Sequence, residues 1–180
     1  VMCGIVGYIG MKQAQPILFH CLAKLEYRGY DSCGIALGGN SITVYKDAVR
    51  IGELAKSLPI LEGSMGIGHT RWATHGGPSR INAHPHCDCT NKIALVHNGI
   101  ITNYESLRQQ LIKEGHTFVS ETDTEIIAHL VERYHQGNVE MAVKNALNDV
   151  EGSYAIIVLA KDENKLVVAR KDSPLIIGIG

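Results

Sequence analysis

Met2-Cys3-Gly4-Ile5-Val6-Gly7 places a cysteine immediately before a short apolar run. The residues from Gly4 to Ile9 are rich in β-branched side chains, which predicts a buried strand. Cys3 is therefore either an ordinary thiol at the start of a strand or a nucleophile that becomes the first residue after processing. An N-terminal nucleophile uses its own α-amino group as the base, and that group titrates at about 7.7–8.0. Such a base raises the thiolate fraction of a thiol whose own pKa is about 8.5.

The composition is typical of a soluble globular protein with one domain. The chain has 180 residues, of which 45% are hydrophobic and 19% charged, and this is enough to bury a core. The formal net charge of −1 gives no reason to expect nucleic acid or an anionic membrane as a partner. No apolar run approaches the ~18 residues of a transmembrane helix, and no secretory signal is visible. Five cysteines at irregular spacing argue against a disulfide framework, so we expect a cytoplasmic protein.

Residue periodicity predicts how helices and strands are grouped along the chain. Helices are expected over about 13–26, within 47–62, and over 102–115, 122–137 and 138–149. Strands are expected over 4–9, 33–38, 42–46, 66–70, 92–96, 154–159 and 166–169. Residues 102–105 and 122–125 fit capping boxes, and Asn98-Gly99 fits a turn at the end of a strand. Strands at both ends with helices between them indicate two packed sheets with outer helices, not a parallel βαβ series.

Six short motifs occur in a fixed order: Met2 to Gly7, Arg28 to Ser32, His69 to Gly76, Asn82 to His86, His97 to Ile100 and Ser120 to Glu125. Together they resemble the glutaminase domains of glucosamine–fructose-6-phosphate aminotransferases, which are class II glutamine amidotransferases of the N-terminal-nucleophile hydrolase family. The resemblance implies an α+β fold, a four-layer αββα sandwich of two mainly antiparallel sheets with outer helices, over residues 1–180. It also implies that L-glutamine is hydrolysed to glutamate and ammonia through a cysteinyl thioester. The ammonia would convert fructose 6-phosphate into glucosamine 6-phosphate.

The resemblance assigns catalytic roles to three residues. Cys3 matches the nucleophile, while the side-chain amide of Asn98 and the backbone N–H of Gly99 match the oxyanion hole. One well-placed donor in such a hole can be worth about 2.7–4 kcal/mol. Without the resemblance, Asn98-Gly99 is more simply interpreted as a hairpin turn.

The resemblance also assigns residues to glutamine binding. Arg71 matches the residue that holds the α-carboxylate, and a planar guanidinium suits the shape of a carboxylate. A surface salt bridge would also explain an arginine at this position. Asp123 matches the residue that binds the α-ammonium, although an acidic residue at a helix N-terminus is favoured in any case. The loop that closes over glutamine in the family corresponds to Trp72, Thr74 and His75, and the latter two help to bind the α-carboxylate end. Arg28 matches a residue near the nucleophile, and a structural turn is an equal alternative.

One further segment contains several potential metal ligands. His84, His86, Cys87 and Cys89 carry nitrogen and sulfur atoms that zinc accepts. Ligands spaced this tightly rarely reach one tetrahedral centre, and the family performs its chemistry without metal. We therefore expect no metal site and no cofactor.

Two alternative functions remain open at this point. The same glutaminase chemistry could serve another acceptor, as in amidophosphoribosyltransferase or asparagine synthetase, or the domain could be a non-catalytic ligand- or metal-binding module. In the first interpretation the partner is a sugar isomerase domain or subunit, and a homodimer is compatible with it. Because the family's domain continues with further strands after the position of Gly180, we expect a fragment or one part of a split system. We also expect that Val1-Met2, which precede Cys3, block its α-amino group until they are removed.

Overall fold

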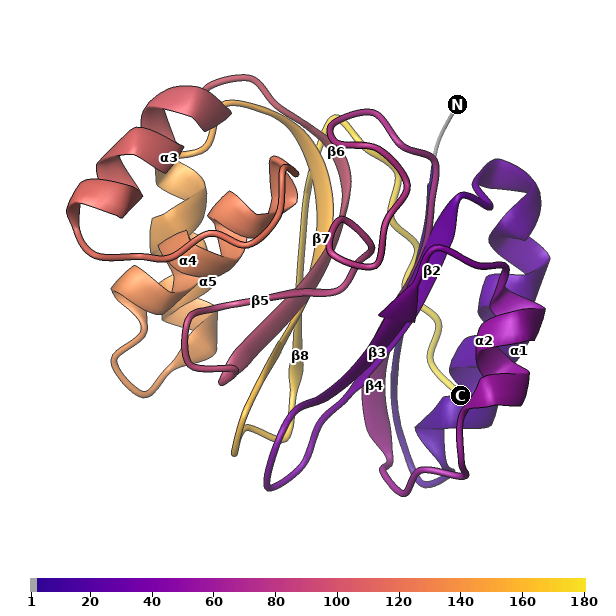
Figure 1. Cartoon of the computed structure of the whole chain (residues 1–180). Helices are drawn as coiled ribbons and strands as arrows, with labels where there is room; N and C mark the ends of the chain where they lie inside the picture. The colour runs from indigo at the N-terminus through magenta and orange to yellow at the C-terminus, as the bar shows by residue number, and fades with distance from the viewer. Residues whose placement is uncertain (1–2) are drawn as a thin grey trace.

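The fold of this computed structural model, which describes residues 3–180, consists of two four-stranded antiparallel sheets between two layers of helices (Figure 1). In the first sheet the strand order is β1 (Gly4–Ile9), β4 (Met65–Arg71), β2 (Ser32–Leu37), β3 (Thr43–Asp47). In the second sheet it is β5 (His86–Cys87), β6 (Ile93–Ile101), β7 (Gly152–Ala160), β8 (Leu166–Lys171). The expected pair of antiparallel sheets is confirmed.

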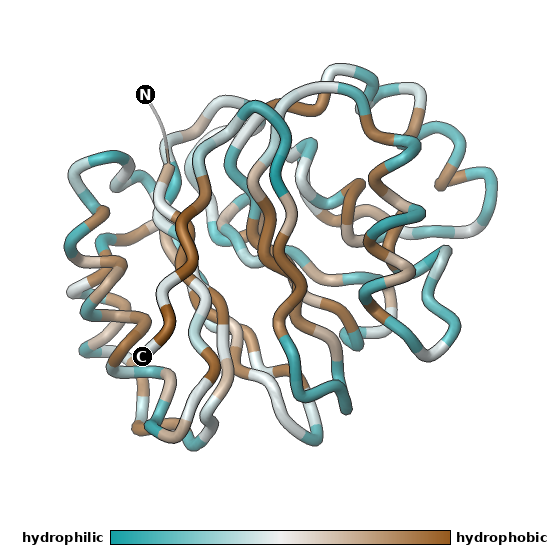
Figure 2. Tube along the Cα trace, turned by 180° about the vertical axis from the view of Figure 1, so that it is seen from behind, coloured by the Kyte–Doolittle hydropathy of each residue, from teal (hydrophilic) through white to brown (hydrophobic). Residues whose placement is uncertain are grey.

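Helices cover the outer face of each sheet. α1 (Ala14–Leu25) and α2 (Ile51–Ser57) pack on the first sheet. α3 (Tyr104–Lys113), α4 (Thr124–Tyr134) and α5 (Val139–Asn148) pack on the second. Both helical layers agree with the sequence predictions, and Figure 2 shows apolar segments along the strands and polar segments on the loops. No helix among residues 3–180 is long and apolar enough to cross a membrane.

The two sheets face one another across a separate apolar core. This core contains Ala36, Met65, Ile67, Ala94, Val96, Ile157 and Leu159. Each sheet also has a core of its own, which lies between that sheet and the helices that cover it. Three buried interfaces between four layers identify the αββα sandwich that the resemblance implied.

The predicted turn at Asn98-Gly99 is wrong, because β6 continues through both residues. Antiparallel pairing with β7 places Asn98 opposite Ala155 and Gly99 opposite Tyr154. Gly99 has a φ of 142°, and a Cβ there would overlap the carbonyl oxygen of Ser153. Glycine is therefore required by a close approach inside a sheet rather than by a turn.

The two predicted capping boxes are also wrong. α3 begins after Asn103 and α4 begins after Asp123, and neither side chain caps its helix. Glu125 instead accepts hydrogen bonds from the backbone N–H groups of Val119 at 2.8 Å and Ser120 at 2.7 Å. This carboxylate therefore fixes the chain that leads into α4, which frees Asp123 for other contacts.

Candidate active site

Cys3 lies at the edge of the first sheet, directly before β1. Because β1 pairs with β4, with Gly4 opposite Thr70, the chain leaving β4 passes beside the cysteine. The backbone N–H of Trp72 donates to Cys3 Sγ at 3.1 Å, and the Trp72 carbonyl oxygen lies 3.6 Å from the same sulfur. Strand pairing thus connects the first described residue with the loop that begins after Arg71.

Asn98 reaches the cysteine from the second sheet. Its Nδ2 donates to the carbonyl oxygen of Cys3 at 2.8 Å, and its Oδ1 lies 3.1 Å from Nε2 of His69. The same His69 nitrogen lies 3.1 Å from the carbonyl oxygen of His97, which can only accept. His69 Nε2 therefore carries the hydrogen, and this fixes the Asn98 amide with its NH₂ group toward Cys3.

Three further histidines form a cluster with His69. The rings of His69 and His84 stack with 4.1 Å between their centres. The rings of His84 and His86 meet edge to face, with 4.7 Å between their centres. Thr124 Oγ1 lies 2.8 Å from His84 Nε2 and 2.9 Å from His97 Nδ1. We call His69, His84, His86 and His97 the histidine stack.

The histidine stack is neutral at physiological pH. All four rings are almost completely buried, and burial lowers the pKa of each of them. For His69 the pKa falls to about 3. An uncharged stack can hold Asn98 without placing a second positive charge beside Arg71. The motif beginning at His69 signalled this region, but sequence reasoning gave this histidine no role.

Arg71 fixes the loop that follows β4. Its side chain is almost completely buried, and its guanidinium donates to the carbonyl oxygens of His75, Gly76 and Gly77. Asp31 holds the start of the same loop, because its Oδ2 accepts the N–H of Ala73 at 2.9 Å. These bonds use three of the five donors of the guanidinium, which leaves donors for a carboxylate.

Asp123 joins the site from the position directly before α4. Its Oδ2 accepts the backbone N–H of Ile101 at 2.9 Å, and the side chain is only 5% exposed. Hydrogen bonding by one oxygen orients the carboxylate and leaves the other oxygen available to a cation.

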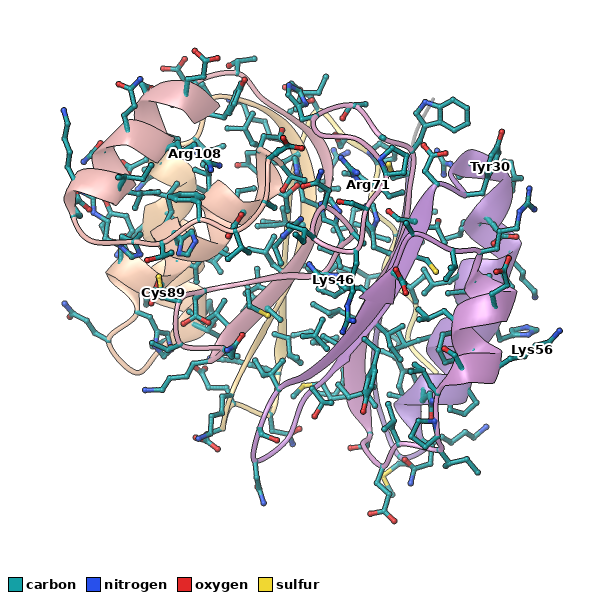
Figure 3. All side chains as sticks on the ribbon, viewed as in Figure 1. Tyr30, Lys46, Lys56, Arg71, Cys89 and Arg108 are labelled. Carbon is teal, nitrogen blue, oxygen red and sulfur yellow. The ribbon has the colours of Figure 1, made fainter. Side chains whose placement is uncertain are left out.

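One cavity of about 1370 Å³ contains nearly all of the predicted site residues. It is lined by Cys3, Arg28, Arg71, Trp72, Thr74, Asn98, Gly99 and Asp123, among others. His75 is the exception, since its ring packs against that of Tyr104 at 5.3 Å. In Figure 3 Arg71 lies between the upper ends of the two sheets. The cavity therefore places a thiol, amide donors, a guanidinium and a carboxylate together.

The four ligands considered in the sequence do not share a centre. His84 and His86 belong to the histidine stack, whereas Cys89 is exposed on a loop. Burial raises the pKa of the Cys87 thiol to about 11, so this cysteine is a poor ligand in its present position.

Comparisons with known proteins agree on one family. Residues 69–178 match the profile of the glutamine amidotransferase domain. The chain is 56% identical over 185 residues to glutamine–fructose-6-phosphate aminotransferase (isomerizing) from Pyrococcus horikoshii, and 55% identical over 184 residues to the enzyme of that name from Clostridium perfringens. These alignments cover 99% of this chain but only 31% and 30% of the two relatives.

Solved structures of related enzymes have the same fold. The glutamine phosphoribosylpyrophosphate amidotransferase of B. subtilis superposes with a TM-score of 0.79 at 29% identity, over 92% of this chain and 36% of that one. A structure described as the allosteric regulatory enzyme of purine biosynthesis superposes with a TM-score of 0.76 at 32% identity. This superposition covers 86% of this chain and 35% of the other.

Proposed function

The chain belongs to the glutamine amidotransferase domain family, and from this premise we propose that it hydrolyses the side-chain amide of L-glutamine. The observation that best supports the proposal is the cavity shared by Cys3, Asn98, Arg71 and Asp123. Arg71 and Asp123 carry opposite charges that match the α-carboxylate and α-ammonium of an amino acid. Cys3 supplies a nucleophile beside the amide donors of Asn98.

The reaction proceeds in two steps through a covalent intermediate. Cys3 Sγ attacks the amide carbon of glutamine, and the side-chain amide of Asn98 and the N–H of Gly99 stabilise the resulting oxyanion. The carbon–nitrogen bond then breaks, and the nitrogen takes up a proton and leaves as ammonia. Water attacks the thioester, which releases glutamate and restores the thiol.

The base in this mechanism is the α-amino group of Cys3 itself. Burial raises the pKa of the Cys3 thiol, and the opposing effects of the Trp72 N–H and the Arg71 charge do not cancel this, so the thiol needs a base at neutral pH. Among residues 3–180 the hydrogen-bond partners of Cys3 Sγ are two backbone atoms of Trp72. Val1 and Met2, which we expect to block the amine, lie outside the described residues.

We further propose that the ammonia is delivered to fructose 6-phosphate. The matched relatives are named for that acceptor and share more than half of their aligned residues with this chain, whereas the phosphoribosylpyrophosphate enzyme shares 29%. The chain spans about 31% of its relatives, so we infer that a sugar isomerase domain or subunit outside residues 1–180 supplies the acceptor site. Five free cysteines are compatible with the reducing cytoplasm that we expect as its location.

The experiment compares glutamate release by two preparations, one beginning at Cys3 and one retaining Val1-Met2, each verified by mass. The form beginning at Cys3 should be active, and the blocked form should lose about 10²–10⁴-fold because the general base is missing. Cys3→Ala should abolish release. Cys21→Ala changes another cysteine that lines the same cavity and should stay within a few-fold of the parent.

The same assay tests the acceptor proposal. With fructose 6-phosphate present, the form beginning at Cys3 and ending at Gly180 should release glutamate but form no aminosugar phosphate. Equal rates for the free and blocked amine would show that another group is the base. Aminosugar formed by this stretch alone would contradict the location that we propose for the acceptor site.

A further inference from the structure

A second group of reactive side chains lies on the helical side of the second sheet. Cys89 follows β5, His116 follows α3, and His129 and Glu132 belong to α4. Each residue contributes one ligand atom, and these four atoms all lie within 4.8 Å of one another. We call these four residues the Cys89 cluster. None of them lines the cavity that contains Cys3, and Figure 3 places Cys89 beside the helices, well away from Arg71.

The distances within the Cys89 cluster are close to those of a tetrahedral metal site. Cys89 Sγ lies 3.5 Å from His129 Nδ1 and 3.8 Å from His116 Nδ1. Glu132 Oε2 lies 2.8 Å from His116 Nδ1 and 3.1 Å from His129 Nδ1. Zinc bonds of about 2.3 Å to sulfur and 2.0–2.2 Å to nitrogen or oxygen place ligand atoms roughly 3.3–3.6 Å apart. Shifts of roughly half an ångström would bring these four distances to that geometry, and the other pairs, which lie within 4.8 Å, need shifts of up to roughly 1 Å.

Hydrogen bonds alone do not join all four side chains of the Cys89 cluster at one time. Both Nδ1 atoms face the thiol of Cys89 and the carboxylate of Glu132 at once, yet each can direct one hydrogen to one partner. When both donate to Glu132, the sulfur keeps only the backbone N–H of Thr117, at 3.4 Å. A cation at the centre binds all four side chains together.

The surroundings of His129 favour Nδ1 as a metal ligand. Its other ring nitrogen, Nε2, lies 3.6 Å from Glu125 Oε1, just beyond hydrogen-bond distance, and both side chains are buried. Within the described part of the chain this Nε2 has no hydrogen-bond partner. Metal-bound histidines commonly direct their second ring nitrogen at a carboxylate, which fixes the tautomer and the ring orientation.

We propose that the Cys89 cluster is a structural zinc site. The thiolate of Cys89 and the carboxylate of Glu132 carry two negative charges, which balance Zn²⁺ when both imidazoles are neutral. A set of one sulfur, two nitrogens and one oxygen suits zinc far better than magnesium or calcium, which prefer oxygen. Four protein ligands leave no open position, so the metal stabilises structure and does not activate water.

Zinc at this position joins three segments that are distant in sequence. It connects the loop after β5, the segment that follows α3, and the C-terminal half of α4. The first residue of α4, Thr124, contacts the histidine stack, and Asp123 directly precedes it in the glutamine site. Zinc therefore stabilises the position of the helix on which both depend.

The test uses zinc and the 180-residue protein carrying Cys3→Ser, so that metal bound to the proposed nucleophile is not counted. Elemental analysis after dialysis should give one zinc per chain, and zinc should raise the Tm. Cobalt(II) should give the visible bands of tetrahedral coordination and a thiolate-to-cobalt charge-transfer band. Cys89→Ser and His116→Gln should each weaken zinc binding more than about 100-fold, because even residues that only support a ligand contribute about 10–100-fold.

Cys87→Ser and His135→Gln are matched controls. Cys87 lies two residues from the cluster, and His135 forms a separate pair with Glu163 at 3.2 Å; both variants should keep the parent affinity. Circular dichroism of each metal-free variant verifies folding, and Glu132→Gln provides an independent ligand variant. Trace zinc with an unchanged Tm would overturn the proposal. So would parent affinity and an intact charge-transfer band in Cys89→Ser.

Discussion

Two groups of histidines contact helix α4 or its first residue, and their partners differ. In the histidine stack the ring nitrogens meet threonine hydroxyls, a side-chain amide and a carbonyl. In the Cys89 cluster they meet carboxylates and a thiol. Both groups consist of imidazoles, so the difference in chemistry comes from the neighbours and not from the residue type.

The net pKa shift of His129 has the opposite direction to the shifts in the histidine stack. Burial lowers the pKa of every histidine in the stack. At His129 burial also acts to lower the pKa, but hydrogen bonds to Glu125 and Glu132 outweigh it and the pKa is raised. The stack is therefore a neutral support for Asn98, whereas the Cys89 cluster is built around negative charge and suits a cation.

The largest expected effect is acid destabilisation caused by the stack. Unfolded histidines bind protons below about pH 6.5, whereas folded His69 does not do so until about pH 3. The unfolded state thus binds more protons in this window, and the free energy of unfolding falls as the pH falls. From pH 7.5 to 5.5 this costs about 1.4 kcal/mol for His69 alone, and the lowered pKa values of His84, His86 and His97 add to the loss.

Urea unfolding at pH 7.5, 6.5 and 5.5 measures this loss. His69→Gln keeps an N–H donor for Asn98 but cannot titrate, so it should reduce the loss by one histidine's share, about 1.4 kcal/mol. If the parent and His69→Gln lose the same free energy of unfolding over this range, folded His69 accepts protons, and the contrast with the Cys89 cluster would disappear.

The next largest effect is expected for Thr124→Val. The hydroxyl of Thr124 lies between His84 Nε2 and His97 Nδ1, and it can donate to one ring and accept from the other. Valine has the same shape but leaves two buried nitrogens without a partner, at about 1–3 kcal/mol each. The free energy of unfolding should fall by about 2–6 kcal/mol.

Thr43→Val is the matched control, because Thr43 is exposed on β3. Its effect should stay within about 0.5 kcal/mol. Equal, small losses in the two valine variants would show that the ring nitrogens of the stack find other partners, so that hydroxyl contacts do not distinguish the two groups.

The sequence predicted most of the fold because the apolar periodicity of the elements is strong. Helices α1, α3, α4 and α5 and most of the strands agree with the predictions within a few residues, whereas β6 continues to Ile101. The predictions failed where tertiary contacts replaced a local preference. Asn98-Gly99 has a turn composition, yet pairing with β7 keeps it in a strand. Glu125 lies where a capping box would need it, yet it binds residues before the helix.

The same reason explains which parts of the candidate site were predicted. Motifs around Cys3, Arg71 and Asn98 identified the cavity, because family resemblance supplied what spacing could not. The Cys89 cluster was missed, since only His129 and Glu132 are close in sequence and the other two ligands come from separate loops. Local spacing instead suggested His84 and His86, whose rings fold into the stack.

The smallest expected effect concerns the packing of His129, which unlike the stacked rings rests on a phenylalanine. The rings of Phe118 and His129 meet edge to face, with 4.4 Å between their centres. The guanidinium of Arg108 lies 4.5 Å from the centre of the Phe118 ring. Aromatic pairs and partly exposed cation–π contacts each contribute about 0.5–1.5 kcal/mol. Phe118→Leu should therefore lower the free energy of unfolding by about 1 kcal/mol more than Phe19→Leu. Phe19 is the control because it is a partly buried phenylalanine in the first helical layer.

The zinc affinity of Phe118→Leu should change less than tenfold, because the four ligands remain. If Phe118→Leu instead removes zinc binding as completely as Cys89→Ser, ring packing and not ligand identity sets the site, and the distinction drawn between the two histidine groups would need revision.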